Sequence, residues 1–228
     1  LSEDLRANVL AKIAAKHQHK VQVIPNFVDS ARITPRDRMT SYRAELRIGS
    51  EPVVMYAGNV GYSQSLTMML HAAQQMPEVT FVINGDGAAR GELEHDAAGL
   101  SNIRFSGYQP ADRVAEVLAT ADIHVVPLRT GLGAVSVPSK TYSILAAGRP
   151  VVAAIDSGTE VTRILAESGA GVSVAPDDPV AFTDALRAMV NSGSTATEAG
   201  ARGRLWVESH VSPARVAHSY LYVIASLG

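Results

Sequence analysis

From Pro52 onward, short apolar runs alternate with stretches in which apolar residues recur every three or four positions. The runs are continuous and do not alternate with polar residues, which is typical of strands covered on both faces. Strands that alternate with helices in this way indicate βαβ units and an α/β fold with a doubly wound, mostly parallel sheet. The predicted strands are 53–57, 79–83, 103–105, 123–128, 151–155 and 171–174, and the predicted helices between them are 66–76, 89–98, 111–120, 139–147 and 160–167.

Both ends of the chain have a different pattern. Residues 1–20 carry Leu5, Val9 and Ile13 at helical spacing, and 21–25 has the composition of a short strand. From about residue 179 the chain is predicted to be helical, with a break at 192–194 and a last helix over 214–227. Because the chain begins with Leu1 and not with Met, we expect it to be the C-terminal part of a longer protein. Residues 1–20 then lead in from an absent N-terminal domain, and 21–228 form an α/β domain with a helical tail.

Composition excludes several classes of protein. The chain is 46% hydrophobic and 18% charged, as expected of a globular protein with a full core. A net charge of -2 argues against a nucleic-acid partner, and the absence of cysteine rules out disulfides and thiolate metal sites. The seven histidines show no metal-binding spacing, and His124 is expected in the core. No apolar run approaches the roughly 20 residues that span a membrane, so a cytoplasmic location is expected.

Small residues follow most of the predicted strands. In an open parallel sheet, ligands bind beyond the carboxyl ends of the strands. Each of these turns by itself is compatible with an ordinary βα connection, but together they clear space in one crevice. The first four predicted strands lead into Gly58 and Gly61, Gly85 and Gly87, Gly107, and Gly131 and Gly133.

The predicted helix 139–147 adds a positive charge to this edge. Pro138 marks its start and Gly148 its end. Lys140 falls in the first turn, where the helix dipole disfavours a cation unless an anion lies over the helix start. Lys140 and Arg129 flank the glycine loop, which indicates a phosphate-bearing ligand. Thr130, Ser136 and Ser139 are expected either to cap the helix or to bind the ligand.

Common catalytic motifs are absent. The sequence has no Gly-x-Ser-x-Gly elbow, no Gly-x-x-x-x-Gly-Lys-Ser/Thr loop and no Gly-x-Gly-x-x-Gly after the first predicted strand. The sequence therefore gives little support to a function as a hydrolase, a P-loop NTPase or a typical dehydrogenase.

Five segments in order resemble a known family. They are 23–29 (Val-Ile-Pro-Asn-Phe-Val-Asp), 56–61 (Tyr-Ala-Gly-Asn-Val-Gly), 83–87 (Ile-Asn-Gly-Asp-Gly), 105–108 (Phe-Ser-Gly-Tyr) and 146–152 (Ala-Ala-Gly-Arg-Pro-Val-Val). The chain is similar to the C-terminal, nucleotide-sugar-binding half of retaining glycosyltransferases of the GT-B fold, family 4. The resemblance covers nearly the whole chain. Pro-Ser-Lys-x-Tyr at 138–142 resembles a subgroup of bacterial surface-polysaccharide transferases.

The chain also departs from this family. Val135 and Ser143 stand where the family carries two glutamates that hold the sugar and the ribose. Asn59 and Gln64 replace the arginine and lysine that the family carries in its first phosphate loop. Lys140 is expected to compensate for the lost positive charge.

The resemblance implies a role for each segment, although it assigns no catalytic residue, metal or other cofactor. The diphosphate is expected at Gly58, Asn59, Gly61, Gln64, Arg129, Ser139 and Lys140. The nucleoside is expected at Gly85, Asp86, Gly107, Tyr108 and Ser143, although Asp86 in a glycine turn equally suits the turn itself. The donor sugar is expected at Thr130, Gly131, Gly133 and Ala134.

The implied activity is transfer of a sugar, with retention, from a nucleoside-diphosphate sugar to an acceptor in bacterial polysaccharide or glycoconjugate synthesis. The absent N-terminal domain is expected to hold the acceptor, such as a sugar or a lipid-linked sugar, and any contact with the inner face of the membrane. Two alternatives remain open. A sugar-nucleotide 2-epimerase needs acid/base groups, for which Asp86 or His124 would have to serve. A non-catalytic nucleotide-binding module is the other.

Overall fold

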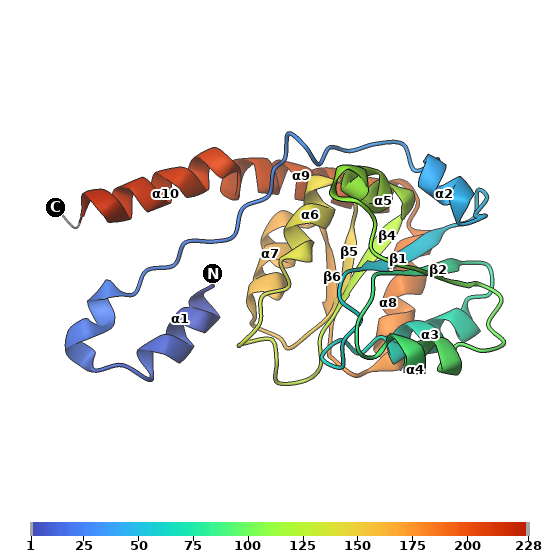
Figure 1. Cartoon of the computed structure of the whole chain (residues 1–228), viewed down its shortest axis with the longest axis horizontal. Coiled ribbons are helices and arrows are strands. Elements are labelled where there is room, and N and C mark those ends of the chain that lie inside the picture. Colours follow the sequence, from blue (N-terminus) through green and yellow to red (C-terminus); the bar gives the residue numbers. More distant parts are fainter. Residues whose placement is uncertain (1, 227–228) are drawn as a thin grey trace.

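The computed structural model describes residues 2–226 and shows one six-stranded parallel sheet in the order β3-β2-β1-β4-β5-β6 (Figure 1). This confirms the predicted fold class, and each strand lies within one or two residues of its predicted bounds. Strand order reverses between β1 and β4, which pair through Val54 with Ile123 and Met55 with His124. The strands are β1 (Val53–Ala57), β2 (Thr80–Asn84), β3 (Ile103–Ser106), β4 (Ile123–Pro127), β5 (Val151–Ala154) and β6 (Gly171–Val174).

Helices connect the strands and form the tail, as predicted. The connecting helices are α3 (Thr67–Gln75), α4 (Arg90–Asp96), α5 (Val114–Thr120), α6 (Lys140–Ala146) and α7 (Glu160–Ser168), with a short 3-10 turn, Ala111–Arg113, before α5. The tail comprises α8 (Pro179–Asn191), α9 (Ser194–His210) and α10 (Pro213–Ala225). The predicted end of the last helix at Leu227 lies outside the described residues.

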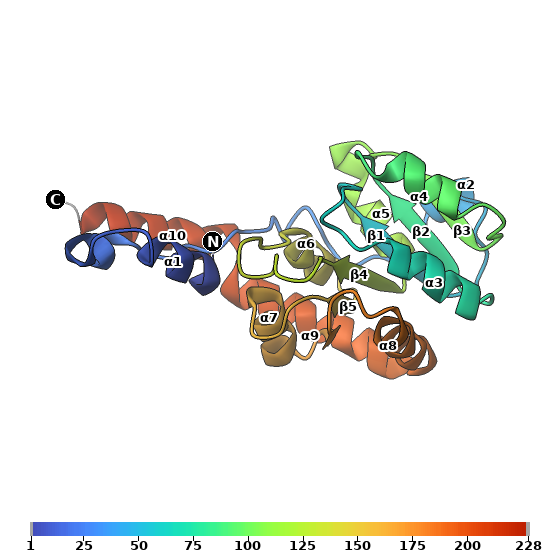
Figure 2. The same cartoon turned by 90° about the horizontal axis from the view of Figure 1, so that it is seen from below.

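The segment before β1 differs from its prediction. The helix predicted over 1–20 is wrong beyond α1 (Glu3–Leu10), because the chain turns there and continues as a 3-10 helix, Ala15–Lys20. The strand predicted at 21–25 is also wrong, since this segment lies beside α10 and not beside a sheet edge. A short helix, α2 (Ser41–Glu45), was not predicted; the Thr40 side chain caps it. Figures 1 and 2 show α1 and α10 projecting together beyond the sheet.

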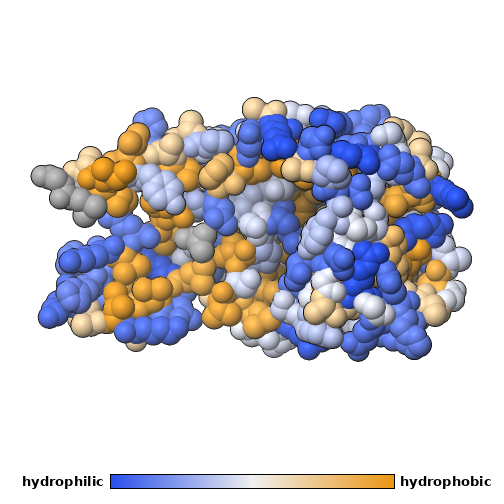
Figure 3. Space-filling view, viewed as in Figure 1, coloured by the Kyte–Doolittle hydropathy of each residue, from blue (hydrophilic) through white to orange (hydrophobic). Residues whose placement is uncertain are grey.

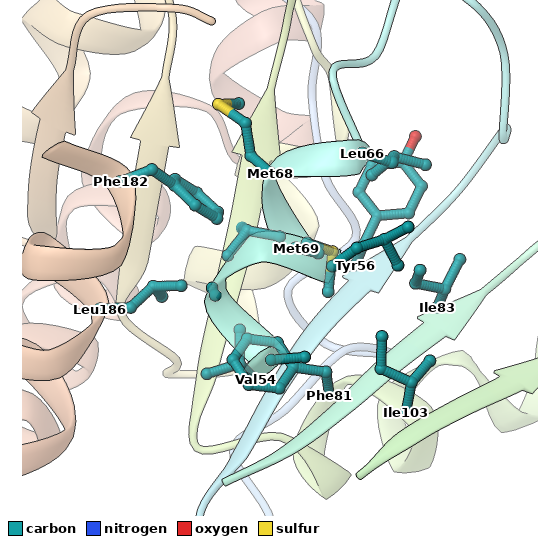
Figure 4. Close-up of a cluster of buried hydrophobic side chains, with 14 of the residues drawn as sticks. Val54, Tyr56, Leu66, Met68, Met69, Phe81, Ile83, Ile103, Phe182 and Leu186 are labelled. Carbon is teal, nitrogen blue, oxygen red and sulfur yellow. The ribbon is translucent and has the colours of Figure 1, made fainter. Parts of the chain in front are cut away.

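The core lies on both faces of the sheet because successive residues of each strand point to opposite sides. On one face, β1 residues Val54 and Tyr56 join Met69 of α3 and Phe182 of α8, all fully buried (Figure 4). On the other face, Met55 packs against Tyr42 of α2. Each such side chain contributes about 1.5–3 kcal/mol by leaving water. This packing holds the carboxyl ends of the strands at one rigid edge.

His124 lies in the core, as predicted. The residue is fully buried in β4, and its Nε2 is 2.9 Å from the carbonyl oxygen of Leu118. Burial lowers the pKa of His124 to about 4, from an ordinary value of 6.5. The histidine is therefore held neutral in the folded protein.

This histidine should make the protein sensitive to acid. Between about pH 6.5 and pH 4 the unfolded chain binds a proton at this position that the folded chain does not, so stability falls as the pH falls. We expect a loss of about 2 kcal/mol between pH 7.5 and pH 5 from this residue. Urea unfolding at both pH values measures it, and the loss should be smaller in His124→Gln. An equal loss in both proteins would contradict the assignment.

No helix in residues 2–226 is both long and apolar enough to cross a bilayer. The same residues contain no cluster of three or more histidine and acidic side chains that would suit a metal ion.

Candidate functional site

The reversal of strand order between β1 and β4 marks the place where open α/β sheets bind their ligands. A cavity of about 210 Å³ opens at this point. Apolar side chains of α5 form one wall, and the start of α6 forms another. The lining residues are Ala57, Gly58, Asn84, Tyr108, Gln109, Val114, Val117, Leu118, Lys140, Ser143 and Ile144.

Lys140 is the only charged residue in this lining. Its Nζ lies 3.7 Å from the centre of the Tyr56 ring, close above the backbone of Gly58. A Cβ atom on Gly58 would lie 2.7 Å from Nζ and displace the lysine, and the φ of 143° also favours glycine at this position. None of the ion pairs in residues 2–226 involves Lys140.

Burial without a counter-ion changes the titration of this lysine. Because desolvation disfavours the ammonium form, the pKa of Lys140 falls to about 7, from an ordinary value of 10.5. An anion bound beside Nζ would restore the charged form. The site is therefore suited to a phosphate group.

The turns around Lys140 are fixed to one another by hydrogen bonds from the main chain and from two side chains. The amide of Gly58 donates to the carbonyl of Asn84 at 2.9 Å, and the Tyr42 hydroxyl donates to the Asn84 side chain. Arg90 Nη1 donates to the carbonyls of Gly85 and Ser106, which joins the turns after β2 and β3. The floor of the cavity is thus rigid before any ligand binds.

Two of the residues predicted to bind the nucleoside line this cavity. Tyr108 is 60% exposed, and its hydroxyl donates to the carbonyl of Asp86 at 3.1 Å. Ser143 also lines an adjoining cavity of about 280 Å³. The Asp86 carboxylate accepts from the amide of Gly87 at 2.7 Å, which is the turn role that the sequence left open. Gly85 and Gly107 belong to the turns after β2 and β3 that adjoin the cavity.

The residues predicted to bind the diphosphate are divided between two places. Gly58 and Lys140 line the cavity described above, whereas Gly61, Gln64 and Arg129 line a separate cavity of about 120 Å³. The Gly61 amide already donates to Gln64 Oε1 at 3.1 Å. This second cavity also carries two carboxylates, which oppose phosphate binding; they belong to Glu92 and Asp96.

Other polar residues in the predicted set face solvent or serve the backbone. Asn59 is exposed, and its carbonyl accepts from the Tyr56 hydroxyl. Ser139 occupies the N-cap position of α6, but its hydroxyl makes no capping hydrogen bond, so the capping alternative is wrong. Its side chain is exposed and free to meet a ligand.

Two aspartates that the sequence analysis missed hold the loop after β4. Asp177 accepts hydrogen bonds from the Thr130 amide and hydroxyl, and Asp156 accepts from the amides of Gly131 and Gly133. Ala134 is exposed at the end of this stretch. Both aspartates follow strands β5 and β6 closely, so the search for small residues after strands passed over them.

A family of known proteins matches this part of the chain. The family described as Glycosyl transferases group 1 matches residues 51–192, which contain the whole sheet and the site. The chain belongs to this family.

Two relatives that are named as glycosyltransferases come from bacteria. The probable glycosyltransferase WbjE of Pseudomonas aeruginosa is 34% identical over 134 residues, covering 57% of this chain and 34% of that protein. The putative colanic acid biosynthesis glycosyl transferase WcaI of Escherichia coli K12 is 29% identical over 143 residues, covering 60% and 35%. The chain thus spans about a third of the length of these curated relatives.

Solved structures show the same fold at low sequence identity. Anabaena Alr3699/HepE in complex with UDP and glucose superposes with a TM-score of 0.86 at 15% identity, covering 99% of this chain and 61% of that one. The C-terminal domain of the group 1 glycosyl transferase LpcC from Francisella tularensis superposes with a TM-score of 0.66 at 19% identity, covering 82% and 99%. A group 1 C-terminal domain has therefore been seen as a folded unit.

Proposed function

We propose that this chain binds the nucleoside-diphosphate sugar for a glycosyltransferase that acts, with retention, in bacterial polysaccharide or glycoconjugate synthesis. One observation carries the proposal: Lys140 is a half-buried cation without a carboxylate partner, at the strand reversal of a group 1 glycosyltransferase fold. The names of WbjE and WcaI and the ligands of HepE agree with this class of substrate.

Lys140 would stabilise the diphosphate as it leaves. Negative charge grows on the leaving group as the bond to the sugar breaks, and a cation held beside it stabilises that charge. The rigid turns at Gly58 and Asn84 hold Nζ in place before the reaction starts. Ser143 lines the same cavity, and its hydroxyl would make a neutral hydrogen bond to the ribose in place of the family's glutamate.

The epimerase alternative finds little support in the described residues. The cavity at Lys140 has no carboxylate or histidine in its lining. The imidazole of His124 is fully buried and bonded to a carbonyl, and the Asp86 carboxylate serves its own turn. The acid/base groups that such an isomerase needs are therefore not supplied by this site.

The acceptor would bind to a part of the protein outside this chain, together with any membrane surface. The end of α10 exposes a hydrophobic stretch (Figure 3), in which Leu221, Tyr222 and Ile224 are 61%, 73% and 64% exposed. We propose that an N-terminal domain packs there and completes the transferase. Without it, this chain should bind donor and transfer no sugar.

Calorimetric titration tests the proposal. The chain is titrated with UDP, GDP, ADP and dTDP, and then with the sugar nucleotide of the base that binds. We expect saturable binding of one nucleoside diphosphate and of its sugar nucleotide. We expect this chain alone to transfer no sugar to an acceptor. Absence of binding by every nucleotide would contradict the proposed function.

A further inference from the structure

The conformation of Asp177 is unusual for its residue type. Its φ is 55°, in the left-handed region that favours glycine, and a side chain held there costs about 1 kcal/mol or more. The Asp177 carboxylate nevertheless makes three contacts across the site edge. One oxygen accepts from the Thr130 amide at 3.0 Å and from its hydroxyl at 2.8 Å, and the other accepts from the Ser65 hydroxyl.

These hydrogen bonds act on the titration of the carboxyl group. Burial alone would raise the pKa of Asp177, but the bonds from Ser65 and Thr130 hold the pKa below its ordinary value. Asp177 therefore stays ionised and joins the loops after β1 and β4.

Asp156 also binds the loop 130–134, at residues other than the one that Asp177 contacts. It follows β5, and its Oδ2 accepts from the amides of Gly131 at 2.9 Å and Gly133 at 3.0 Å. The Thr159 hydroxyl donates to the Asp156 carbonyl at 2.8 Å, which fixes the turn that carries the carboxylate. A Cβ on Gly133 would lie 2.7 Å from the Thr159 methyl carbon, so glycine is needed for this close approach.

The order of the strands shows where the loop 130–134 lies relative to the other residues of the site. Tyr108 follows β3 at one edge of the sheet, Lys140 lies at the reversal between β1 and β4, and the two aspartates follow β5 and β6 at the other edge. A donor with its nucleoside near Tyr108 and its diphosphate at Lys140 would extend its sugar toward 130–134.

We infer that Asp156 and Asp177 are positioning residues that hold the loop 130–134 in the shape that receives the sugar of the donor. The inference rests on the proposed function and adds residues whose side chains bind the loop and not the ligand. Loss of either carboxylate frees two donors in the loop, so the loop loses its fixed shape while the cavity at Lys140 keeps all of its lining. Affinity for the sugar nucleotide should fall, and affinity for the diphosphate alone should remain.

Three variants and a control test this inference. Asp177→Gly removes the carboxylate, and glycine adopts the left-handed backbone without strain, so this variant should still fold. Asp156→Ala removes the second carboxylate, and Asp156→Asn keeps one accepting oxygen and should restore part of the function. Asp184→Ala is the control, because Asp184 is exposed on α8 and pairs only with Arg187.

Each variant is titrated with the diphosphate and the sugar nucleotide that bind the wild type, starting with UDP and UDP-glucose. Asp177→Gly and Asp156→Ala should bind the sugar nucleotide roughly tenfold more weakly, equivalent to about 1.4 kcal/mol, and bind the diphosphate as the wild type does. Amide hydrogen exchange should accelerate within 129–139 in both. Unchanged affinity for the sugar nucleotide, or an equal loss for both ligands, would overturn the inference alone. Failure of the wild type to bind any nucleotide would overturn the proposed function and the inference with it.

Discussion

Replacement of Lys140 by methionine is expected to weaken nucleotide binding and to stabilise the ligand-free protein. Methionine is apolar and of similar length, so it fills the space beside Tyr56 without a charge. Loss of a charge-assisted bond to phosphate should weaken binding by about 2 kcal/mol, or roughly thirtyfold. Removal of a half-buried cation that lacks a carboxylate partner should raise the free energy of unfolding near neutral pH by about 1 kcal/mol.

The sign of this effect with pH follows from the lowered pKa of Lys140. Between about pH 7 and pH 10.5 the unfolded chain holds a proton on this lysine that the folded chain has lost, so wild-type stability rises with pH in that window. The advantage of Lys140→Met should be greatest below pH 7 and shrink toward pH 10.5. Urea unfolding at several pH values measures it, with exposed Lys16→Met as the control. A variant that is less stable than the wild type at pH 6.5, or that binds nucleotide as tightly as the wild type, would contradict the role assigned to Lys140.

Alanine at position 85 should have the largest effect on folding. A Cβ there would lie 1.8 Å from the carbonyl oxygen of Gly58, and the φ of 148° lies in a region that other residues rarely adopt. The clash is between main-chain atoms, so no side chain can move to relieve it. The turns after β1 and β2 would have to separate, with loss of the bond from Gly58 to Asn84. We expect Gly85→Ala to destabilise the protein by about 3 kcal/mol or more.

Gly107→Ala is the matched control for this variant. Gly107 also follows a strand at the site edge, but a Cβ there meets nothing within 4 Å. Its free energy of unfolding should lie within about 0.5 kcal/mol of the wild type. Equal stability of the two variants in urea unfolding would mean that the close approach at Gly85 does not constrain the fold.

The sheet could be predicted from sequence because its strands are buried on both faces. Residues 53–57 and 151–155 are continuous apolar runs, a pattern that few other structures produce. The strand predicted at 21–25 is wrong because an apolar segment forms a strand only where another strand lies beside it. This segment lies along α10 instead. The helix α2 has only five residues, too few to show a periodic pattern.

The candidate site was only partly predictable. Lys140 could be predicted because a cation in the first turn of a helix conflicts with the helix dipole. The separation of Gly61 and Arg129 from Lys140 could not be predicted. The turns that follow neighbouring strands look alike in sequence, yet they open into different cavities. Asp156 and Asp177 were missed because their carboxylates bind backbone amides of a loop far away in the chain.

The location of the bound nucleotide tests the central claim most directly. Amide NMR spectra of the labelled chain, recorded during titration with the diphosphate that binds, report which residues meet it. The account predicts the largest shifts at Gly58, Tyr108, Lys140 and Ser143, around the cavity at the strand reversal. Shifts confined to Gly61, Gln64 and Arg129 would place the ligand in the neighbouring cavity and contradict the role assigned to Lys140.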